Sequence, residues 1–454
     1  MAKYQKYAEY KDSGVEWLGD IPSHWIATAL KRYAKITDGS HHSPKIESEG
    51  FPFVSVTDVG INNINFVDAK KITENDYLRL VKEGCKPAVN DVLLTKDGTI
   101  GRACIVTEDM PDFVILSSLG LITPNKEISS HFLYYYLVSG INVDQMNSVI
   151  HGSALKRMTI NKINDLIFTF PDFYEQEKIA NFLDHETAKI DTLIAKQEKL
   201  IELLKEKRQA VISHAVTKGL NPDVPMKDSG VEWLGQVPEH WDVSALGYYS
   251  FLNTGATPDR SNARYWDGDI PWIKTGEVRY DTIYETEETI SDLALKQTSV
   301  QLSPVGTLLM AMYGQGITRG RVAILGIPAT YNQACVAITP NKKIWNEYLK
   351  LFFMAGYHAI RDGGNETSQM NLNADIVKKF KITVPPYQEQ EEIVNDINKR
   401  IPKIDDLLSK AESVIQLMQE RRTALISSAV TGKIDVRNWQ NPNNNNEAQT
   451  ELSR

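Results

Sequence analysis

The sequence predicts a mixed α+β fold in which two globular segments are separated by two long helices, in an arrangement that occurs twice along the chain. Three observations predict it. One string of 15 residues occurs twice, an apolar heptad pattern follows each globular segment, and both globular segments alternate short β-rich runs with turn residues. We therefore expect an internal two-fold pseudo-repeat.

The repeat begins with KDSGVEWLGDIPSHW at residues 11–25 and KDSGVEWLGQVPEHW at 227–241, which are identical at 12 of 15 positions. Downstream, PDFYEQEKIANFL at 171–183 pairs with PPYQEQEEIVNDI at 385–397. The copies diverge between these anchors. Repeat proteins keep the contacts between units and vary their binding faces. The pattern therefore predicts two equivalent joints that carry two different surfaces.

The globular segments, residues 26–170 and 242–384, contain short apolar runs typical of strands. These runs are PFVSV, DVLLT and ACIVT in the first segment, and PWIKT, GTLLMAM and RVAIL in the second. Each segment then has an apolar helical pattern, HFLYYYLVSG from residue 131 and EYLKLFFMAG from residue 347. Both segments should form mixed α/β domains.

The stretch from Tyr174 to Thr217 contains neither Pro nor Gly, and the matching stretch of the second copy is interrupted only by Pro402. Heptad spacing of apolar residues predicts a helix of about 43 residues, roughly 65 Å long, in each copy. A long helix with one apolar stripe needs a partner, so we expect the two helices to form an intramolecular coiled coil. The expected seam residues are Ile179, Leu183, Ile190, Leu193, Leu200, Leu204 and Val211, then Ile393, Ile397, Ile404, Leu407, Ala411, Val414, Met418 and Leu425.

These patterns divide the chain into five parts. Residues 1–170 hold the first repeated element and globular domain, 171–220 the first long helix, 221–384 the second element and domain, and 385–437 the second long helix. Residues 438–454 are rich in Asn and low in hydrophobic residues, so we expect them to be disordered.

Composition excludes some classes of protein. The 50 Lys and Arg residues face 58 Asp and Glu, which gives a net charge of -8 and no overall basic signature for nucleic-acid binding. Residues 26–170 carry 15 positive and 16 negative charges, and residues 242–384 carry 14 of each. No apolar stretch approaches the roughly 20 residues that cross a bilayer. With three widely spaced cysteines and no signal-peptide core, the sequence predicts a cytoplasmic protein that does not contact a membrane.

No catalytic motif emerges from the sequence. The Gly-rich stretch YGQGITRGRVAIL at 313–325 lacks the spacing of a phosphate-binding loop. Asp172 and Glu175 begin a long helix, where carboxylates are favoured by the helix dipole. His41 and His42 are adjacent, a spacing poorly suited to chelating one metal. We therefore expect no catalytic residue, no metal site and no cofactor bound by this chain.

With these strings in place, the chain resembles a specificity subunit of a type I restriction-modification enzyme from residue 10 to about residue 437. The resemblance rests on VEWLGDIPSHW, DGSHHSP (38–44), NTGATPDRSNARYWDGDIPWIKTGEV (253–278), YGQGITRGRVAIL and PYQEQEEI, in that order. It implies that the divergent segments are target recognition domains, that the two long helices are antiparallel, and that the subunit is not itself an enzyme.

The resemblance also implies partners. Two methyltransferase subunits should bind around the chain and methylate adenine in double-stranded DNA, and two motor-nuclease (restriction) subunits should add cleavage. S-adenosylmethionine, ATP and Mg²⁺ would then be bound by those partners. Two unlike domains on a stiff spacer should recognise an asymmetric, bipartite DNA target, with half-sites about 10 base pairs apart centre to centre.

Candidate residues follow from these roles. Polar side chains in loops after short strands suit base edges: Arg and Lys pair with guanine, Asn and Gln with adenine. The DNA-binding candidates are His41, His42, Lys45, Lys96 and Arg102 in the first domain, and Arg260, Asn262, Lys274, Gln315, Thr318, Arg319 and Arg321 in the second. For each, a salt bridge or a loop hydrogen bond is the structural alternative. The candidates for holding domains to helices or for contacting partners are Trp17, Trp25, Trp233, Trp241, Glu175, Gln176, Glu389 and Gln390.

Two other functions stay open at this point. A self-contained methyltransferase or nuclease would bind S-adenosylmethionine or Mg²⁺ by itself. A scaffold protein would use its coiled coil only to organise partners, and replacing residues 26–170 with another recognition domain would leave the choice of DNA target unchanged.

Overall fold

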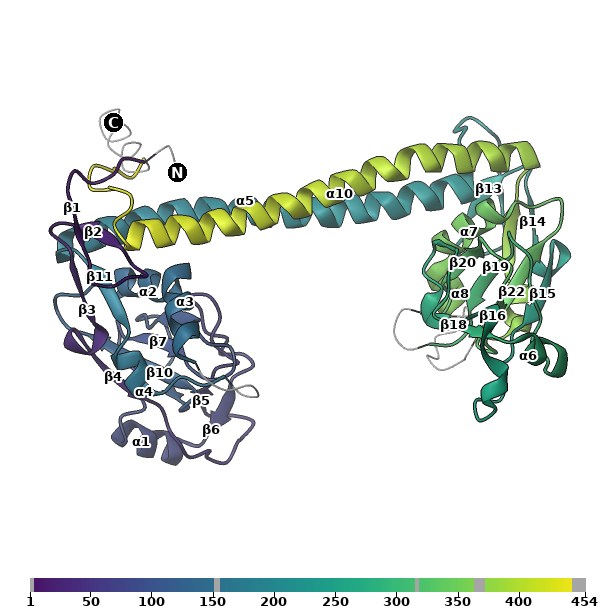
Figure 1. Cartoon of the computed structure of the whole chain (residues 1–454). Helices are drawn as coiled ribbons and strands as arrows, with labels where there is room; N and C mark the ends of the chain where they lie inside the picture. The colour runs from purple at the N-terminus through teal and green to yellow at the C-terminus, as the bar shows by residue number, and fades with distance from the viewer. Residues whose placement is uncertain (1–3, 151–155, 315–317, 363–371, 443–454) are drawn as a thin grey trace. The chain divides into compact units, whose positions relative to one another are not determined.

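A computed structural model describes residues 4–150, 156–314, 318–362 and 372–442. The chain forms two compact units. Unit 1 comprises residues 1–197 and 413–454, and unit 2 comprises residues 198–412. Both long helices continue from one unit into the other: α5 spans Phe173–Lys218 and α10 spans Tyr387–Val430 (Figure 1).

The strands and helices that precede α5 all belong to unit 1. They are β1 (Tyr10–Asp12), β2 (Asp20–Pro22), β3 (Ile26–Ala29), β4 (Ala34–Asp38), β5 (Phe51–Val54), β6 (Lys70–Ile72), α1 (Glu74–Lys82), β7 (Val92–Thr95), β8 (Ala103–Ile105), β9 (Val114–Ile115), β10 (Leu119–Pro124), α2 (Ser130–Val138), α3 (Gly140–Val149), α4 (Ile160–Asn164) and β11 (Ile167–Phe170).

The elements between the two long helices belong to unit 2. They are β12 (Met226–Asp228), β13 (Gln236–Pro238), β14 (Asp242–Ala245), β15 (Ser250–Thr254), β16 (Trp266–Ile273), β17 (Thr282–Ile283), β18 (Glu288–Ile290), α6 (Asp292–Gln297), β19 (Leu308–Ala311), β20 (Val322–Leu325), β21 (Thr330–Tyr331), β22 (Cys335–Pro340), α7 (Asn346–Ala355), α8 (Tyr357–Asp362), α9 (Ala374–Lys379) and β23 (Lys381–Val384).

The sheets repeat from unit to unit, which confirms the predicted pseudo-repeat. Unit 1 has sheets ordered β4-β10-β7-β8 and β6-β5-β9, and unit 2 has β15-β22-β19-β20-β17 and β18-β16-β21. The pairs β1-β2 and β3-β11 recur as β12-β13 and β14-β23. β11 and β23 lead directly into α5 and α10, so each long helix starts at an equivalent strand. The predicted α+β class is confirmed.

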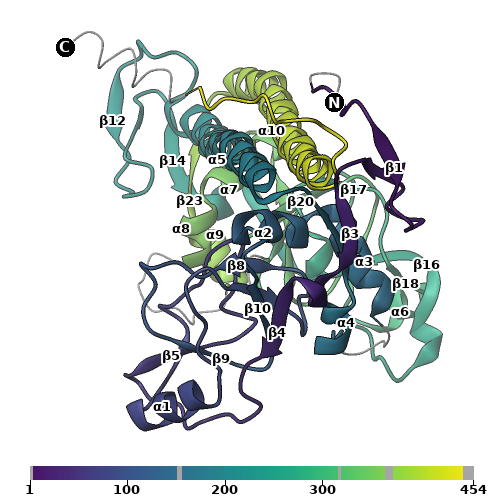
Figure 2. The same ribbon diagram turned by 90° about the vertical axis from the view of Figure 1, so that its left-hand side faces the viewer.

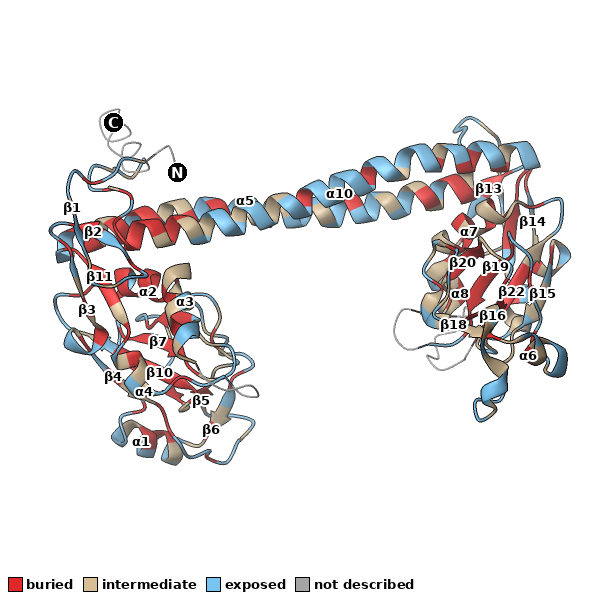
Figure 3. Cartoon of the chain, viewed as in Figure 1, coloured by how far each residue is buried: buried red, intermediate tan, exposed pale blue. Residues whose placement is uncertain are grey.

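The predicted helical patterns form α2 and α7, but α2 is apolar nearly all round. Its residues from Phe132 to Leu137 are all buried, because the helix lies in the unit 1 core together with β7, β8 and the first turns of α5. In each unit the start of one long helix and the end of the other therefore belong to the core of the globular part, and Figure 3 shows buried residues in red at both ends of α5.

The two long helices lie side by side in both views (Figures 1 and 2) and run antiparallel. The predicted heptad period is confirmed, whereas the predicted register is wrong in the middle of the seam. Leu193, Leu200 and Leu407 are 45%, 43% and 50% exposed. Residues one position later replace them, because a helix of 3.6 residues per turn drifts against a strict heptad count. On α5 the observed seam is Ile190, Ile194, Gln197, Ile201, Leu204, Arg208 and Val211. On α10 it is formed by the residues at the equivalent positions of the repeat: Ile404, Leu408, Ala411, Ile415, Met418, Arg422 and Leu425.

The two ends of the described chain meet in unit 1. Gln5 and Asp435 form an antiparallel bridge, and the Tyr10 hydroxyl donates to the carbonyl of Gly432 at 3.1 Å. Trp439 packs edge-on against Phe182, with ring centroids 5.6 Å apart. The start of the tail, which we expected to be disordered, is therefore ordered at Trp439, because its indole packs against an aromatic ring of α5. Residues 443–454 lie outside the described residues.

Gly432 is required at its position. Its φ is +69°, a conformation that favours glycine after the end of a helix, and a Cβ there would lie 2.3 Å from Pro22. The chain that follows α10 can therefore turn closely over β2.

Candidate nucleic-acid interface

The first helix junction is built around the carboxylate of Glu175, in the first turn of α5. Its Oε1 accepts hydrogen bonds from the Tyr7 hydroxyl at 2.6 Å and from Trp25 Nε1 at 3.2 Å, while Oε2 lies 2.8 Å from His24 Nε2. Glu175 is 4% exposed and Trp25 is fully buried. Burial, followed by the hydrogen bond to Glu175, raises the pKa of Tyr7 well above its usual range. The junction thus ties the His-Trp end of the repeated string to α5.

The second junction uses the same residues at the equivalent positions. Glu389 Oε2 accepts a hydrogen bond from Trp241 Nε1 at 3.0 Å and lies 2.9 Å from His240 Nε2. Trp241 is fully buried, whereas the side chain of Glu389 is 24% exposed. Gly219 closes this junction from the end of α5, since a Cβ there would lie 3.2 Å from the Trp241 ring. The second junction therefore has two donors where the first has three.

The glutamine after each glutamate joins the long helix to the globular part. Gln176 is fully buried; its Oε1 accepts from the Ser129 amide at 2.9 Å, and its Nε2 donates to the carbonyls of Glu127 and Pro171 at 2.9 and 3.0 Å. The fully buried Gln390 makes the same three kinds of contact, with the amide of Trp345 and the carbonyls of Lys343 and Pro385. An amide side chain suits this place because it satisfies one donor and two acceptors at once.

The other two repeated indoles, which we also expected to hold a domain to the helices or to contact partners, are less buried than Trp25 and Trp241. Trp17 is 44% exposed, on the turn between β1 and β2. Trp233 is half-buried and stacks on Phe380, with ring centroids 6.0 Å apart, next to Phe352 of α7. These indoles lie eight residues before the buried ones, on the turn between the two strands of each hairpin.

The described parts of the chain include two ion pairs that join the long helices, one in each unit. Arg422 Nε donates to Asp191 Oδ1 at 2.9 Å, and Arg208 Nε donates to Asp405 Oδ1 at 2.8 Å. The repeat offset of 214 residues maps Asp191 onto Asp405 and Arg208 onto Arg422, so the two pairs are symmetry equivalents. Sequence reasoning missed them, although arginine at a seam position in both copies was a signal available in the sequence.

Four candidates of the first domain are exposed. They are His41, His42, Lys45 and Arg102. His41 Nε2 lies 3.1 Å from Asp38 Oδ2, and Lys45 Nζ lies 2.8 Å from Glu47 Oε1. Both side chains remain well exposed, at 64% and 82%, so these ion pairs leave them accessible.

Lys96 differs from the expectation for a base-contacting residue because it is only 2% exposed. Its ammonium lies 3.8 Å from Asp38 Oδ2 and 4.0 Å from Asp97 Oδ1, at the end of β7. The equivalent position after β19 is Met312, also 2% exposed. The position is therefore part of the domain interior, and in the first domain the nearby carboxylates compensate the lysine charge there.

In the second domain, Arg260 and Lys274 share one carboxylate. Arg260 Nη1 donates to Glu288 Oε2 at 2.5 Å, and Lys274 Nζ lies 2.9 Å from Glu288 Oε1 and 2.8 Å from Glu287 Oε2. Asn262 is a helix cap whose Oδ1 accepts from the backbone amide of Arg264 at 3.2 Å. The candidates of this loop are therefore held in place by local partners.

The remaining candidates lie around the Gly-rich stretch. Thr318, Arg319 and Arg321 are half-buried, and Gln315 lies outside the described residues. The Arg321 guanidinium lies 5.7 Å from the ring centre of Tyr280, which has a φ of +73°, a strained conformation for an aromatic residue. Burial raises the pKa of Tyr280 to about 12. Strain of this kind often marks a functional loop.

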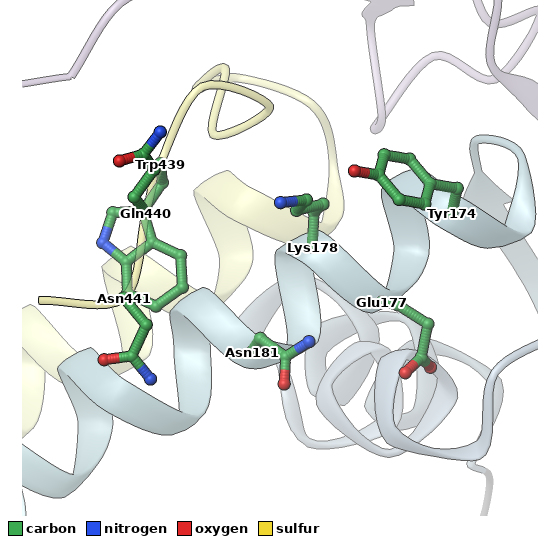
Figure 4. Close-up of a pocket in the computed structure, with 7 residues that line it drawn as sticks. All are labelled: Tyr174, Glu177, Lys178, Asn181, Trp439, Gln440 and Asn441. Carbon is green, nitrogen blue, oxygen red and sulfur yellow. The ribbon is translucent and has the colours of Figure 1, made fainter. Parts of the chain in front are cut away.

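A polar pocket of about 570 Å³ lies between the first turns of α5 and the segment after α10 (Figure 4). Within it, Lys178 lies over the Tyr174 ring, while the Ser129 hydroxyl donates to Glu177. The charged ends of Glu177 and Lys178 point in different directions in Figure 4, so they do not converge on a reacting group. Its lining residues are Tyr174, Glu177, Lys178, Asn181, Trp439, Gln440 and Asn441.

Among the described residues, no three His, Cys, Asp or Glu side chains are grouped so that they could hold a metal ion. None of the helices in the described ranges combines the length and the apolar character that a membrane span needs.

Comparison with known proteins gives consistent matches over nearly the whole chain. The model of the type I restriction modification DNA specificity domain matches residues 41–203 and again residues 238–413. The type I restriction enzyme MjaIX specificity subunit of Methanocaldococcus jannaschii is 22% identical over 448 residues, covering 96% of this chain and 99% of that protein. The EcoKI specificity subunit of Escherichia coli is 20% identical, with 94% and 92% covered.

Among solved structures, the HsdS subunit from Thermoanaerobacter tengcongensis superposes with a TM-score of 0.53 at 12% identity, covering 91% of this chain and 98% of that one. A chain from a structure of type I R-M complex assembly and conformational transition superposes with a TM-score of 0.71 at 13% identity, covering 91% and 99%. These likenesses show that the fold is shared over 91% of this chain.

Proposed function

Because the chain belongs to the type I restriction modification DNA specificity family, we propose that it recognises an asymmetric, bipartite DNA target through its two divergent domains. The chain is a specificity subunit without a catalytic site of its own, and its partners carry out adenine methylation and, with the motor-nuclease subunits, cleavage. The observation that carries the proposal is that one junction is built twice, at Glu175 and Glu389, in two units whose loops differ in sequence.

The partners are double-stranded DNA, two methyltransferase subunits and two restriction subunits. Two equivalent partner sites are supported by the duplicated strings, which place Trp17 and Trp233 on equivalent hairpin turns. An apolar pocket of about 680 Å³ beside Trp233, bordered by Lys379 and Lys381, supports a protein contact there. S-adenosylmethionine, ATP and Mg²⁺ would be bound by these partners.

The DNA contacts in the first domain would come from His41, His42, Lys45 and Arg102. Those in the second would come from Arg260, Asn262, Lys274, Thr318, Arg319 and Arg321, with Gln315 in the same stretch. The near-neutral charge of both domains argues that the methyltransferase subunits supply most of the phosphate contacts, because counterion release needs basic groups. The two domains would then contribute more to the sequence specificity of DNA binding than to its affinity.

Four of the five parts predicted from the sequence would have separate roles. Residues 1–170 and 221–384 would carry the half-site specificities, while 171–220 and 385–437 would set the distance between them. Half-sites about one helical turn of DNA apart would fit this arrangement.

The decisive experiment maps modified bases across the host genome with and without the gene. Loss of one bipartite methyladenine motif on deletion supports the proposal, and exchange of residues 26–170 for another recognition domain should then change one half-site only. If the exchange leaves the motif intact, the chain is a scaffold. Methyl transfer by the purified chain alone would instead make it an enzyme.

A further inference from the structure

The loop before β16 holds one arginine in an aromatic stack. The guanidinium carbon of Arg260 lies 3.8 Å from the ring centre of Trp266 and 4.9 Å from that of Trp272. The two indoles are perpendicular, with ring centroids 5.1 Å apart. Trp272 is 2% exposed and belongs to a small core with Ile290. The platform beneath Arg260 is therefore anchored in the domain.

A hydrogen bond to Glu288 also holds the Arg260 guanidinium in place. Glu288 Oε2 accepts from Arg260 Nη1 at 2.5 Å, and its Oε1 pairs with Lys274. The hydrogen bond from Arg260 is the main cause that lowers the pKa of Glu288, so the carboxylate stays ionised and keeps the guanidinium in place. Even so, the Arg260 side chain is 55% exposed. Its position is thus fixed while part of its edge remains accessible.

An arginine held in this way suits a base better than a phosphate. The guanidinium offers N–H donors in a planar fork, and stacking with one fixed hydrogen bond lowers the entropy that a second, bidentate contact would cost. Glu288 balances its charge, which weakens attraction to a phosphate. The acceptor pair that matches the fork on a base edge is O6 and N7 of guanine, in the major groove.

The first domain has a different arrangement at the corresponding hairpin, β5 and β6. There Phe51 stacks on Tyr77, with ring centroids 4.1 Å apart, and Lys86 Nζ lies 5.9 Å from the centre of the Tyr77 ring. A lysine lacks the planar fork. The two corresponding hairpins thus hold different cations on their aromatic rings, arginine beside β16 and lysine beside β5, as expected where two domains recognise unlike half-sites.

We propose that Arg260 reads a guanine in the half-site of the second domain, with Trp266 and Glu288 as positioning residues. This inference rests on the proposed function and names one of its base contacts. In unit 2, β16, β18 and α6 lie on the side away from the helix pair (Figure 1), which leaves the platform clear of the helices.

The test uses the full chain assembled with its methyltransferase partner on DNA libraries in which each position of the target is varied. R260K keeps the charge and loses the fork, and R260A removes both. We expect either change to reduce discrimination at one G·C pair by about 5- to 150-fold, with the salt dependence of binding nearly unchanged. E288Q should give a smaller loss at the same base pair.

Arg264 provides the matched control. It is exposed four residues away, and the described residues give its side chain no ion pair or aromatic partner. R264K and R264A should therefore leave the recognised sequence unchanged. A folding defect in R260A is separated from a recognition defect by R260K and by the thermal unfolding of both variants.

Several outcomes would overturn the inference. Uniform weakening on all targets, with the salt slope reduced by about one, would make Arg260 a phosphate contact. An unchanged motif in R260K and R260A, or a second half-site without any G·C pair, would also reject it while the proposed function stands. If the wild-type complex methylates no bipartite motif, the proposed function itself fails.

Discussion

Replacing the carboxylate at each helix junction with alanine tests whether Glu175 and Glu389 hold the repeated strings to the helices. E175A leaves two buried donors, Tyr7 and Trp25, without an acceptor, while the partly exposed His24 can turn to water. At about 1–3 kcal/mol for each unsatisfied buried group, unit 1 should lose about 2–6 kcal/mol of stability.

The second junction is the internal control for this experiment. E389A leaves one buried donor, Trp241 Nε1, without an acceptor, because the side chain of His240 is 45% exposed and can bond to water. Its expected cost is about 1–3 kcal/mol, and the solvent that already reaches Glu389 should place it at the lower end. Replacing glutamate with alanine should therefore reduce the stability of unit 1 more than that of unit 2.

Hydrogen exchange resolved by peptide is the appropriate assay, because a chain of two units need not unfold in one step. E175A should lower the opening free energy of amides in α2 and β11, and E389A that of amides in α7 and β23. Each variant should leave the other unit's globular part unchanged. Equal losses at both junctions, or a larger loss for E389A, would refute the count of buried donors.

Three further predictions use other contacts. Reversing the Asp191–Arg422 pair as D191R with R422D should restore most of the roughly 0.2–1 kcal/mol that each single change costs, whereas additive losses in a double-mutant cycle would exclude a direct contact. The pKa of Tyr7 is raised, so its contribution is present below pH 10 and is lost as pH rises above it; Y7F should flatten the alkaline fall in stability, and an unchanged slope would contradict this. Burial raises the pKa of Cys104 to about 11 and of Cys335 to about 12, so both thiols should resist alkylation at pH 8 until the chain unfolds; reaction of the native protein at either thiol would show that its domain opens locally.

Much of the architecture was predictable because the chain supplies its own comparison. Strings kept in both copies marked the junction residues Trp25 and Glu175, and the heptad period marked both helices. The seam register was not predictable at Leu193, because adjacent apolar residues such as Ile194 satisfy the same pattern and helix drift decides between them.

The burial of Lys96 could not be predicted from the sequence for a different reason. Its partner Asp38 lies 58 residues earlier, and only pairing of both strands with β10 brings the two side chains together. The Arg260 platform combines residues from three short segments in the same way. The sequence therefore identifies which loop residues have a suitable type, but only the fold determines whether their side chains are accessible.

The two junctions differ in one respect that their shared residues do not explain, which is the third donor from Tyr7. In unit 2 the segment 219–225 joins the end of α5 to β12 covalently, so the parts of that junction stay close through the chain itself. In unit 1 the end of α10 and the start of β1 are far apart in sequence and meet only through contacts such as Tyr10 with Gly432. The hydrogen bond from Tyr7 to Glu175 joins the segment before β1 to the first turn of α5, and it offsets part of the entropy that closing this long loop costs. The first junction thus combines an additional donor with a more buried carboxylate, because the side chain of Glu175 is 6% exposed and that of Glu389 is 24% exposed.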